Sequence, residues 1–101
     1  MTRTNFQDLK ARKLAAMTPE DRAVFDDTYE ATRLAIEVGE KVRNAREAAG
    51  FSQRELALRM GTSQAAVARL EAGGTGATLT TLQKVAGALD LRVTIELSTA
   101  S

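Results

Sequence analysis

The amino-acid sequence predicts a mainly α fold, because three observations agree. Apolar residues recur at spacings of three and four through most of the chain, as they do on one face of a helix. Serine or threonine stands directly before several of these runs, where it can cap a helix. Only residues 92–97 alternate polar and apolar side chains like a β-strand. A chain of 101 residues has room for one small helical core and not for two domains.

Residues 1–35 are predicted to form an N-terminal helical arm. An imperfect helical stripe of apolar side chains begins it, with basic residues on the other side: Phe6, Leu9, Leu14 and Met17. A weakly apolar segment of this kind suits a surface helix that folds back on the core and, equally, a motif that docks on a partner protein.

A second helix is predicted to begin at Pro19, with Thr18 as its cap and acidic residues in its first turn. No proline follows, so helical character extends as far as Ala49. A glycine inside a helix costs up to ~1 kcal/mol, and Gly39 lies within this run. We therefore expect two pieces or one bent helix, of which residues 37–49 form the first helix of a domain.

Two short helices joined by a tight turn are predicted between Gly50 and Glu71. Ser52 is suited to cap the first of them, and Glu55, three residues on, completes a capping box. Gly61 supplies the left-handed residue that ends a helix at low cost. A connection of three or four residues between two helices is the helix-turn-helix arrangement.

The second of these helices is predicted to start after Ser63 and to bury Val67 and Leu70. That phase leaves one amide, one guanidinium and several small side chains at or near the outer face: Gln64, Ala65, Ala66, Ala68 and Arg69. Glutamine pairs with adenine, arginine with guanine, and alanine meets a thymine methyl group in the major groove of DNA. The capped helices and the turn make DNA recognition a better interpretation than a plain solvated face.

The stretch GFSQRELALRMGTSQAAVARLEAG resembles the core of the XRE family of helix-turn-helix regulators, to which phage repressors of the Cro and CI type belong. The similarity covers roughly residues 38–91. It implies a five-helix DNA-binding domain over residues 36–91. The positions that would contact DNA, with Gln53 on a backbone phosphate, are Gln53, Arg54, Ser63, Gln64, Ala65, Ala66 and Arg69. The resemblance also implies an internal salt bridge between Arg46 and Glu71.

The glycine-rich run after Glu71 is predicted to be a loop, and without a following G-K-[ST] it does not indicate a nucleotide site. Thr78 is suited to cap one more helix. The inward stripe of this helix is predicted to be Leu79, Leu82, Val85, Ala86 and Leu89.

Residues 92–101 are predicted to form a C-terminal strand and tail, with three apolar side chains on one face: Val93, Ile95 and Leu97. The backbone groups of a strand need a partner, and no other segment of the chain offers one. We expect antiparallel pairing with the same strand of a second copy across a two-fold axis. The last helix and the arm are alternative sources of the dimer contact.

Composition excludes most catalytic chemistry. The chain has no histidine and no cysteine, so the usual general base, the thiol nucleophile and the soft metal ligands are absent; we expect no catalytic residue, no metal and no cofactor. There is no long apolar run and no signal-peptide pattern, so we expect a cytoplasmic, nucleoid-associated protein. Residues 32–76 hold seven basic and five acidic side chains, which places a small positive excess in the predicted DNA-binding segment.

An arm ahead of an XRE domain, followed by a strand-forming tail, resembles HigA-type antitoxins. The resemblance implies a protein that represses its own operon as a dimer on palindromic DNA and neutralises a small RelE-like (HigB-type) ribonuclease toxin. The candidate toxin-binding residues are Phe6, Leu9, Leu14, Phe25 and Tyr29. A stand-alone repressor of phage or host type, and a protein-interaction adaptor that keeps the fold as a scaffold, are the alternatives.

Overall fold

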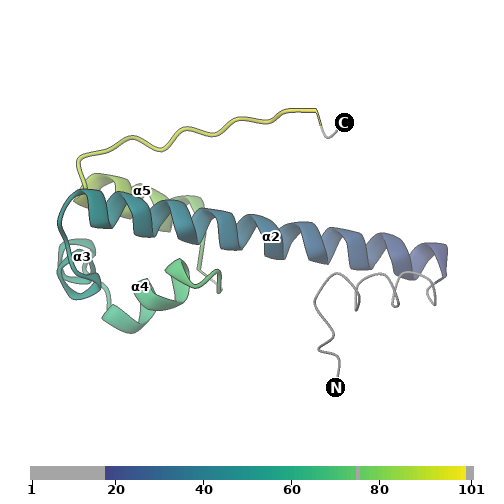
Figure 1. Ribbon diagram of the computed structural model, residues 1–101, viewed down its shortest axis with the longest axis horizontal. Helices are drawn as coiled ribbons and strands as arrows, with labels where there is room; N and C mark the ends of the chain where they lie inside the picture. Colours follow the sequence, from purple (N-terminus) through teal and green to yellow (C-terminus); the bar gives the residue numbers. More distant parts are fainter. Residues whose placement is uncertain (1–17, 75, 100–101) are drawn as a thin grey trace, which may run out of the picture. The chain divides into compact units, whose positions relative to one another are not determined.

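The structure, a computed structural model, describes residues 18–74 and 76–99. It falls into two compact units, residues 1–32 and residues 33–101. Four helices lie in the described ranges: α2 (Pro19–Ala48), α3 (Gln53–Met60), α4 (Gln64–Glu71) and α5 (Leu79–Ala88) (Figure 1). None of the described helices is both long and apolar enough to cross a membrane.

Helix α2 begins where the sequence predicts, because the backbone N–H of Asp21 donates to the Thr18 hydroxyl at 3.2 Å. It continues without interruption through Gly39, so of the two expected forms, two pieces or one bent helix, the structure has a single helix, and four helices lie in the described residues where five were expected. The reason is tertiary. Gly39 is buried, and a side chain there would collide with the end of α4, so the residue is a point of close approach between helices and not a helix break.

All four helices contribute to one small core in the second unit. Its buried members are Val42 of α2, Leu56 and Ala57 of α3, Val67 and Leu70 of α4, and Val85 and Leu89 of α5. Partly buried side chains such as Val38, Phe51 and Leu82 pack around them. Because the core is built almost entirely from aliphatic side chains, the fold depends on close fitting of helices more than on large aromatic anchors.

One member of the predicted inward stripe of α5 is misplaced. Thr78 caps the helix through the N–H of Thr81 at 3.1 Å, and Val85, Ala86 and Leu89 are buried as expected. Leu79, however, is 64% exposed. Leu79 is the first residue of α5, one turn before the buried residues of that helix. Its spacing fits the apolar face of the helix, but the spacing alone did not ensure its burial.

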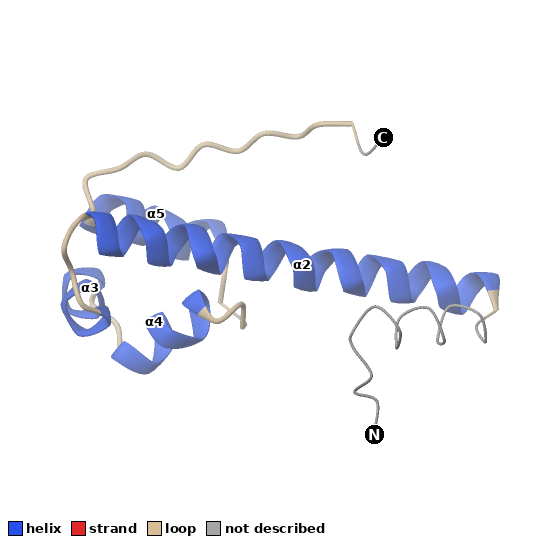
Figure 2. Ribbon diagram, viewed as in Figure 1, coloured by secondary structure: helices blue, strands red, loops and turns tan. Residues whose placement is uncertain are grey.

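The chain leaves α5 through a left-handed turn. Asp90 adopts φ 59°, and the N–H of Leu91 donates to the Ala86 carbonyl at 2.7 Å, which closes the end of the helix. Residues 91–99 then run as an extended segment, drawn in tan in Figure 2, and the described chain contains no strand. A strand is defined by its partner, and none lies among the described residues. The pairing of this tail with a second copy therefore stays a prediction.

Candidate nucleic-acid interface

The first helix of the helix-turn-helix pair is closed at both ends by its own sequence. At the start of α3 the N–H of Glu55 donates to the Ser52 hydroxyl at 3.0 Å, and the N–H of Ser52 donates to the Glu55 carboxylate at 3.3 Å. This is the capping box that the sequence predicts. At the other end Gly61 has φ 72°, and the N–H of Thr62 donates to the Ala57 carbonyl at 2.9 Å. The chain can therefore turn within three residues.

Helix α4 starts immediately after that turn and shows two different faces. The N–H of Ala66 donates to the Ser63 hydroxyl at 3.1 Å, which caps the helix. Val67 and Leu70 are buried in the core, as their spacing predicts. On the outer side Gln64, Ala65 and Arg69 are exposed, and the small Ala66 and Ala68 are half-buried. Short side chains between a glutamine and an arginine leave a helix surface that can come close to a groove floor.

The C-terminal end of α4 is fixed by a buried ion pair with α2. The Arg46 Nε lies 2.6 Å from the Glu71 Oε2, and the Arg46 Nη2 donates to the Glu71 Oε1 at 3.0 Å. The Arg46 Nη1 also donates to the Phe51 carbonyl at 2.7 Å, just before α3. Each of the two charged residues is only 8% exposed. The ion pair, which the family resemblance implied, thus connects α2, α4 and the start of α3.

A third side chain joins this pair, which the sequence did not indicate. The Gln53 Nε2 donates to the Glu71 Oε1 at 3.1 Å, and Gln53 is half-buried at the first position of α3. The residue proposed to contact a DNA phosphate is therefore held from behind by the same carboxylate that holds Arg46. Gln53 and Glu71 are 18 residues apart, so no local sequence pattern predicts their hydrogen bond.

The electrostatics of the pair follow from its hydrogen bonds. Burial acts to raise the pKa of Glu71, but the hydrogen bonds from Arg46 and Gln53 outweigh it, so the Glu71 pKa lies below its usual range. The hydrogen bond to Glu71 raises the pKa of Arg46 despite its burial. No buried side-chain nitrogen or oxygen in the described residues lacks a partner. Both groups are therefore charged at neutral pH.

The lowered pKa of Glu71 predicts loss of stability in acid. Above the ordinary glutamate value of 4.5 the carboxylate is ionised in both states and its stabilising effect is complete. As the pH falls below 4.5 the unfolded chain takes up the proton first, so the free energy of unfolding decreases toward the folded-state pKa. Denaturant midpoints measured at successive pH values should show a shallower fall for Glu71→Gln. An identical slope in the two proteins would contradict the assignment.

Two glycines allow α2 and the end of α4 to approach each other. A Cβ on Gly39 would lie 2.6 Å from the carbonyl oxygens of both Leu70 and Glu71. Just beyond α4, Gly73 has φ 83°, and a Cβ there would lie 2.7 Å from the Ile36 Cγ1. Together with the ion pair, these contacts fix the distance between α2 and the end of α4. They therefore also fix the position from which Gln64 and Arg69 project.

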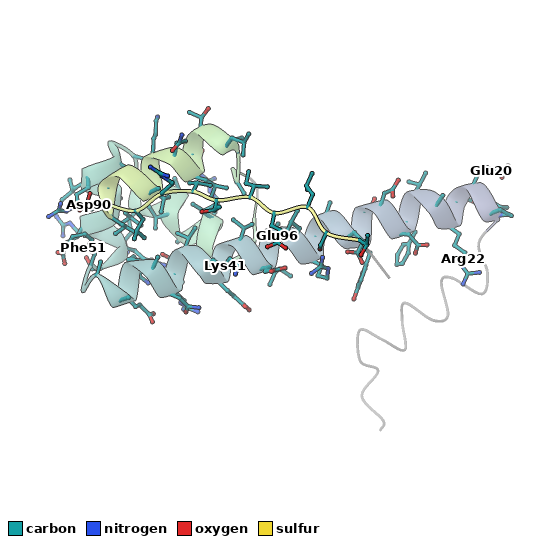
Figure 3. All side chains as sticks on the ribbon, turned by 90° about the horizontal axis from the view of Figure 1, so that it is seen from above. Glu20, Arg22, Lys41, Phe51, Asp90 and Glu96 are labelled. Atoms are coloured by element: carbon teal, nitrogen blue, oxygen red, sulfur yellow. The ribbon has the colours of Figure 1, made fainter. Side chains whose placement is uncertain are left out.

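Two exposed arginines lie on α3, the helix that precedes α4. Arg54 lies in the first turn of α3 and is exposed. Arg59, in the last turn of α3, places its guanidinium carbon 4.3 Å from the centre of the Phe51 ring, which restrains a side chain that the sequence did not single out. Figure 3 shows Phe51 at the end of the unit that carries α3. Exposed arginines are suited to contact the phosphate groups of DNA.

Of the candidate toxin-binding residues, the structure describes only Phe25 and Tyr29, both on α2. Phe6, Leu9 and Leu14 lie outside the described residues. Phe25 and Tyr29 are half-buried, one turn apart on α2, and both make contacts with neighbouring groups. In the described part of the chain no group of three or more acidic residues gathers in a way that could hold a metal ion. All of the predicted DNA contacts lie on α3, on α4 or at the cap of α4, within residues 33–101.

Comparisons with known proteins agree with this geometry. A helix-turn-helix family model matches residues 42–95, which is more than half of the chain. A solved structure of the restriction-modification controller protein C.AhdI from Aeromonas hydrophila is similar, with 31% identity and a TM-score of 0.58 over 60% of this chain and 88% of that one. No curated protein matches the chain significantly. The chain therefore belongs to the helix-turn-helix family of XRE type, and it is a DNA-binding transcription regulator.

Proposed function

We propose that the protein is a non-enzymatic repressor that binds a palindromic operator as a dimer, with α4 of each copy in the major groove. The observation that carries this proposal is the outer face of α4, where Gln64, Ala65 and Arg69 are exposed on a helix held by a cap at one end and a buried ion pair at the other. A helix fixed in this way presents base-reading side chains without loss of order on binding.

Each proposed contact has a role that follows from its place. Gln64 and Arg69 read base edges, and the small Ala65 and Ala66 allow close approach. Gln53, Arg54 and Ser63 lie at the starts of α3 and α4, where free N–H groups and side chains suit phosphate oxygens. The hydrogen bond between Gln53 and Glu71 would hold that phosphate contact in register with α4.

Loss of base reading is the direct test. Gln64→Ala or Arg69→Ala should weaken operator binding by about 1–3 kcal/mol each and reduce the preference for operator over scrambled DNA. Arg54→Ala should weaken both duplexes alike, because phosphate contacts carry no sequence information. The measurement is fluorescence anisotropy with labelled duplexes, with the operator first located by selection from a random DNA library.

Gln83→Ala on α5 and Arg22→Ala on α2 are matched controls for this test, because both residues are exposed and lie outside the α3–α4 pair. Affinity should also fall as salt rises, since phosphate contacts release counterions. Equal losses for Gln64→Ala and Gln83→Ala, or binding that is flat between low and physiological salt, would argue against the proposed mode.

Two narrower functions fit the proposed repressor. The similarity to a restriction-modification controller supports a stand-alone regulator that binds its own operator without a toxin. The separate compact unit that contains residues 1–32, with Phe25 and Tyr29 on α2, supports an antitoxin whose arm binds a small RelE-like ribonuclease. The adaptor hypothesis finds no such support.

The neighbouring reading frames separate these two functions. Co-expression with each adjacent frame, followed by purification through a tag on this chain, should recover a small basic protein if the antitoxin function is correct. Phe25→Ala with Tyr29→Ala should then abolish recovery and leave operator binding intact. An adjacent methyltransferase or endonuclease frame, with no protein recovered, would favour the controller-like function.

A further inference from the structure

The seven residues that follow α5 have a self-complementary order. They read Leu91-Arg92-Val93-Thr94-Ile95-Glu96-Leu97. When two copies lie antiparallel with Thr94 opposite Thr94, Arg92 of each copy faces Glu96 of the other. Val93 then faces Ile95, and Leu91 faces Leu97. Opposite charges, aliphatic pairs and threonine pairs directly across an antiparallel ladder are all favourable.

Neighbouring registers lose this match. An axis at Val93 places Asp90 opposite Glu96, two like charges, and an axis at Ile95 leaves Arg92 opposite Ser98 and Glu96 opposite Thr94. An axis between two residues places apolar side chains opposite polar ones, because residues that face each other lie on the same side of a sheet. The tail therefore specifies one register and specifies its partner as another copy of itself.

No segment of the described residues pairs with the tail. Ile95 is 63% exposed and Leu97 is 95% exposed, although they lie on the apolar face of the alternation. Within the described residues neither Arg92 nor Glu96 has an ion-pair partner. Two opposite charges and a row of aliphatic side chains are thus available for pairing at the same time.

A groove beside the tail gives the apolar face a place to pack. It has a volume of about 560 Å³ and lies among the tail, the second half of α2 and α5. Its apolar lining includes Leu34, Val38 and Val42 from α2 and Leu82 and Val85 from α5. Figure 3 shows the tail running from Asp90 past Glu96, along the same axis direction as α2. Side chains from a second tail would continue this surface.

We infer that the tail pairs with the tail of a second copy in a two-stranded antiparallel sheet centred on Thr94, with two reciprocal Arg92–Glu96 pairs on its polar face. This sheet would be the dimer contact of the proposed repressor. Its role in repression rests on the proposed function, but the pairing itself needs no DNA. The left-handed Asp90 and the hydrogen bond from Leu91 to Ala86 make a short, closed turn between α5 and the tail, so the sheet would connect the two helix-turn-helix units through this turn.

A single cysteine tests the register, because the natural chain has none. Thr94→Cys places two thiols opposite each other across the axis, within the Cα separation that a disulfide requires, so mild oxidation should convert most of the protein into a covalent dimer. Ser98→Cys is the matched control on the same tail. In this register its two thiols lie roughly 27 Å apart along the ladder and should stay reduced. Cross-linking of Ser98→Cys as fast as that of Thr94→Cys, or none at Thr94→Cys, overturns the inference.

Charge reversal tests the ion pairs. Arg92→Glu alone and Glu96→Arg alone should each raise the dimer dissociation constant roughly 10- to 30-fold in sedimentation, because two attractive pairs become repulsive. The double variant Arg92→Glu/Glu96→Arg keeps the net charge and should restore the homodimer. A mixture of the two single variants should form heterodimers in preference to either homodimer. Unchanged dimerisation of the single variants, or a natural chain that stays monomeric at micromolar concentration, overturns the inference.

These results are separable from failure of the proposed function. Gln64→Ala should lose operator preference while a Gln64→Ala/Thr94→Cys chain still cross-links, because the tail and α4 do different tasks. If Thr94→Cys cross-links but the protein binds no operator, the pairing of the tails is supported and the proposed repressor function is contradicted.

Discussion

Replacement of Gly39 by alanine is expected to destabilise the second unit by about 2–3 kcal/mol, although alanine is normally the better helix former. The new methyl group would lie 2.6 Å from two backbone carbonyl oxygens at the end of α4. Backbone atoms cannot rotate out of the way as a flexible side chain can, so α2 and α4 must separate. That separation disturbs the buried Arg46–Glu71 pair and the core contact of Leu70 as well.

The matched control for this prediction is Gly87→Ala. Gly87 is also inside a helix, α5, but a Cβ there meets nothing within 4 Å. This change should stabilise the protein by about 0.5–1 kcal/mol, through lower backbone entropy in the unfolded state. Urea denaturation of both variants at one fixed protein concentration measures the difference, since a dimer makes stability depend on concentration. Opposite signs are the expected pattern; two stabilised proteins would show that the close approach is not real.

Replacement of Arg46 by methionine is expected to cost about 3–5 kcal/mol. It would leave the Glu71 carboxylate buried with only the Gln53 amide as a partner and would remove the hydrogen bond to the Phe51 carbonyl. A small domain has roughly 5–15 kcal/mol of total stability, so much of the protein would be unfolded at physiological temperature. Thermal and urea unfolding followed by circular dichroism measure the effect.

Two further variants show why the loss occurs. Arg46→Met combined with Glu71→Met removes both charges and should recover most of the stability, because the cost lies in the unpaired charge and not in the absent ion pair. Arg43→Met breaks an exposed pair with Glu47, whose atoms are 3.6 Å apart, and should change stability by less than about 1 kcal/mol. A double variant as unstable as Arg46→Met would contradict the explanation.

Glu71 variants also bear on DNA recognition. The Glu71 carboxylate accepts hydrogen bonds from both Arg46 and Gln53, so loss of that carboxylate weakens the restraint on the Gln53 side chain proposed for phosphate contact. Any Glu71→Gln protein that remains folded should bind operator and scrambled DNA more weakly by a similar factor, because a phosphate contact is sequence-independent.

The sequence predicted those features that are encoded by neighbouring residues. The caps at Thr18, Ser52, Ser63 and Thr78 and the left-handed Gly61 all act within four residues, so their effect does not depend on the rest of the fold. The buried face of α4 followed from the same local logic. Once Val67 and Leu70 are inside, the helical period places Gln64 and Arg69 outside.

Features that depend on residues distant in the chain were not predictable in this way. Gly39 is compatible with a helix break and with a close helix contact, and only the position of Leu70 and Glu71 decides between them. The hydrogen bond of Gln53 to Glu71 and the exposure of Leu79 likewise depend on where α4 and the core lie. The ion pair of Arg46 came from family resemblance, because two opposite charges 25 residues apart are common on any surface.

The exposed alternation of the tail also has a consequence for solubility. A strand with unpaired N–H and C=O groups and free Ile95 and Leu97 side chains is a template for aggregation with any strand that meets it. Arg92 and Glu96 interrupt the apolar sequence as gatekeepers, because a foreign strand that leaves both charges unmatched pairs poorly. Neutral residues at both positions would keep the alternation and remove this protection, so such a chain would tend to form insoluble material in place of defined dimers.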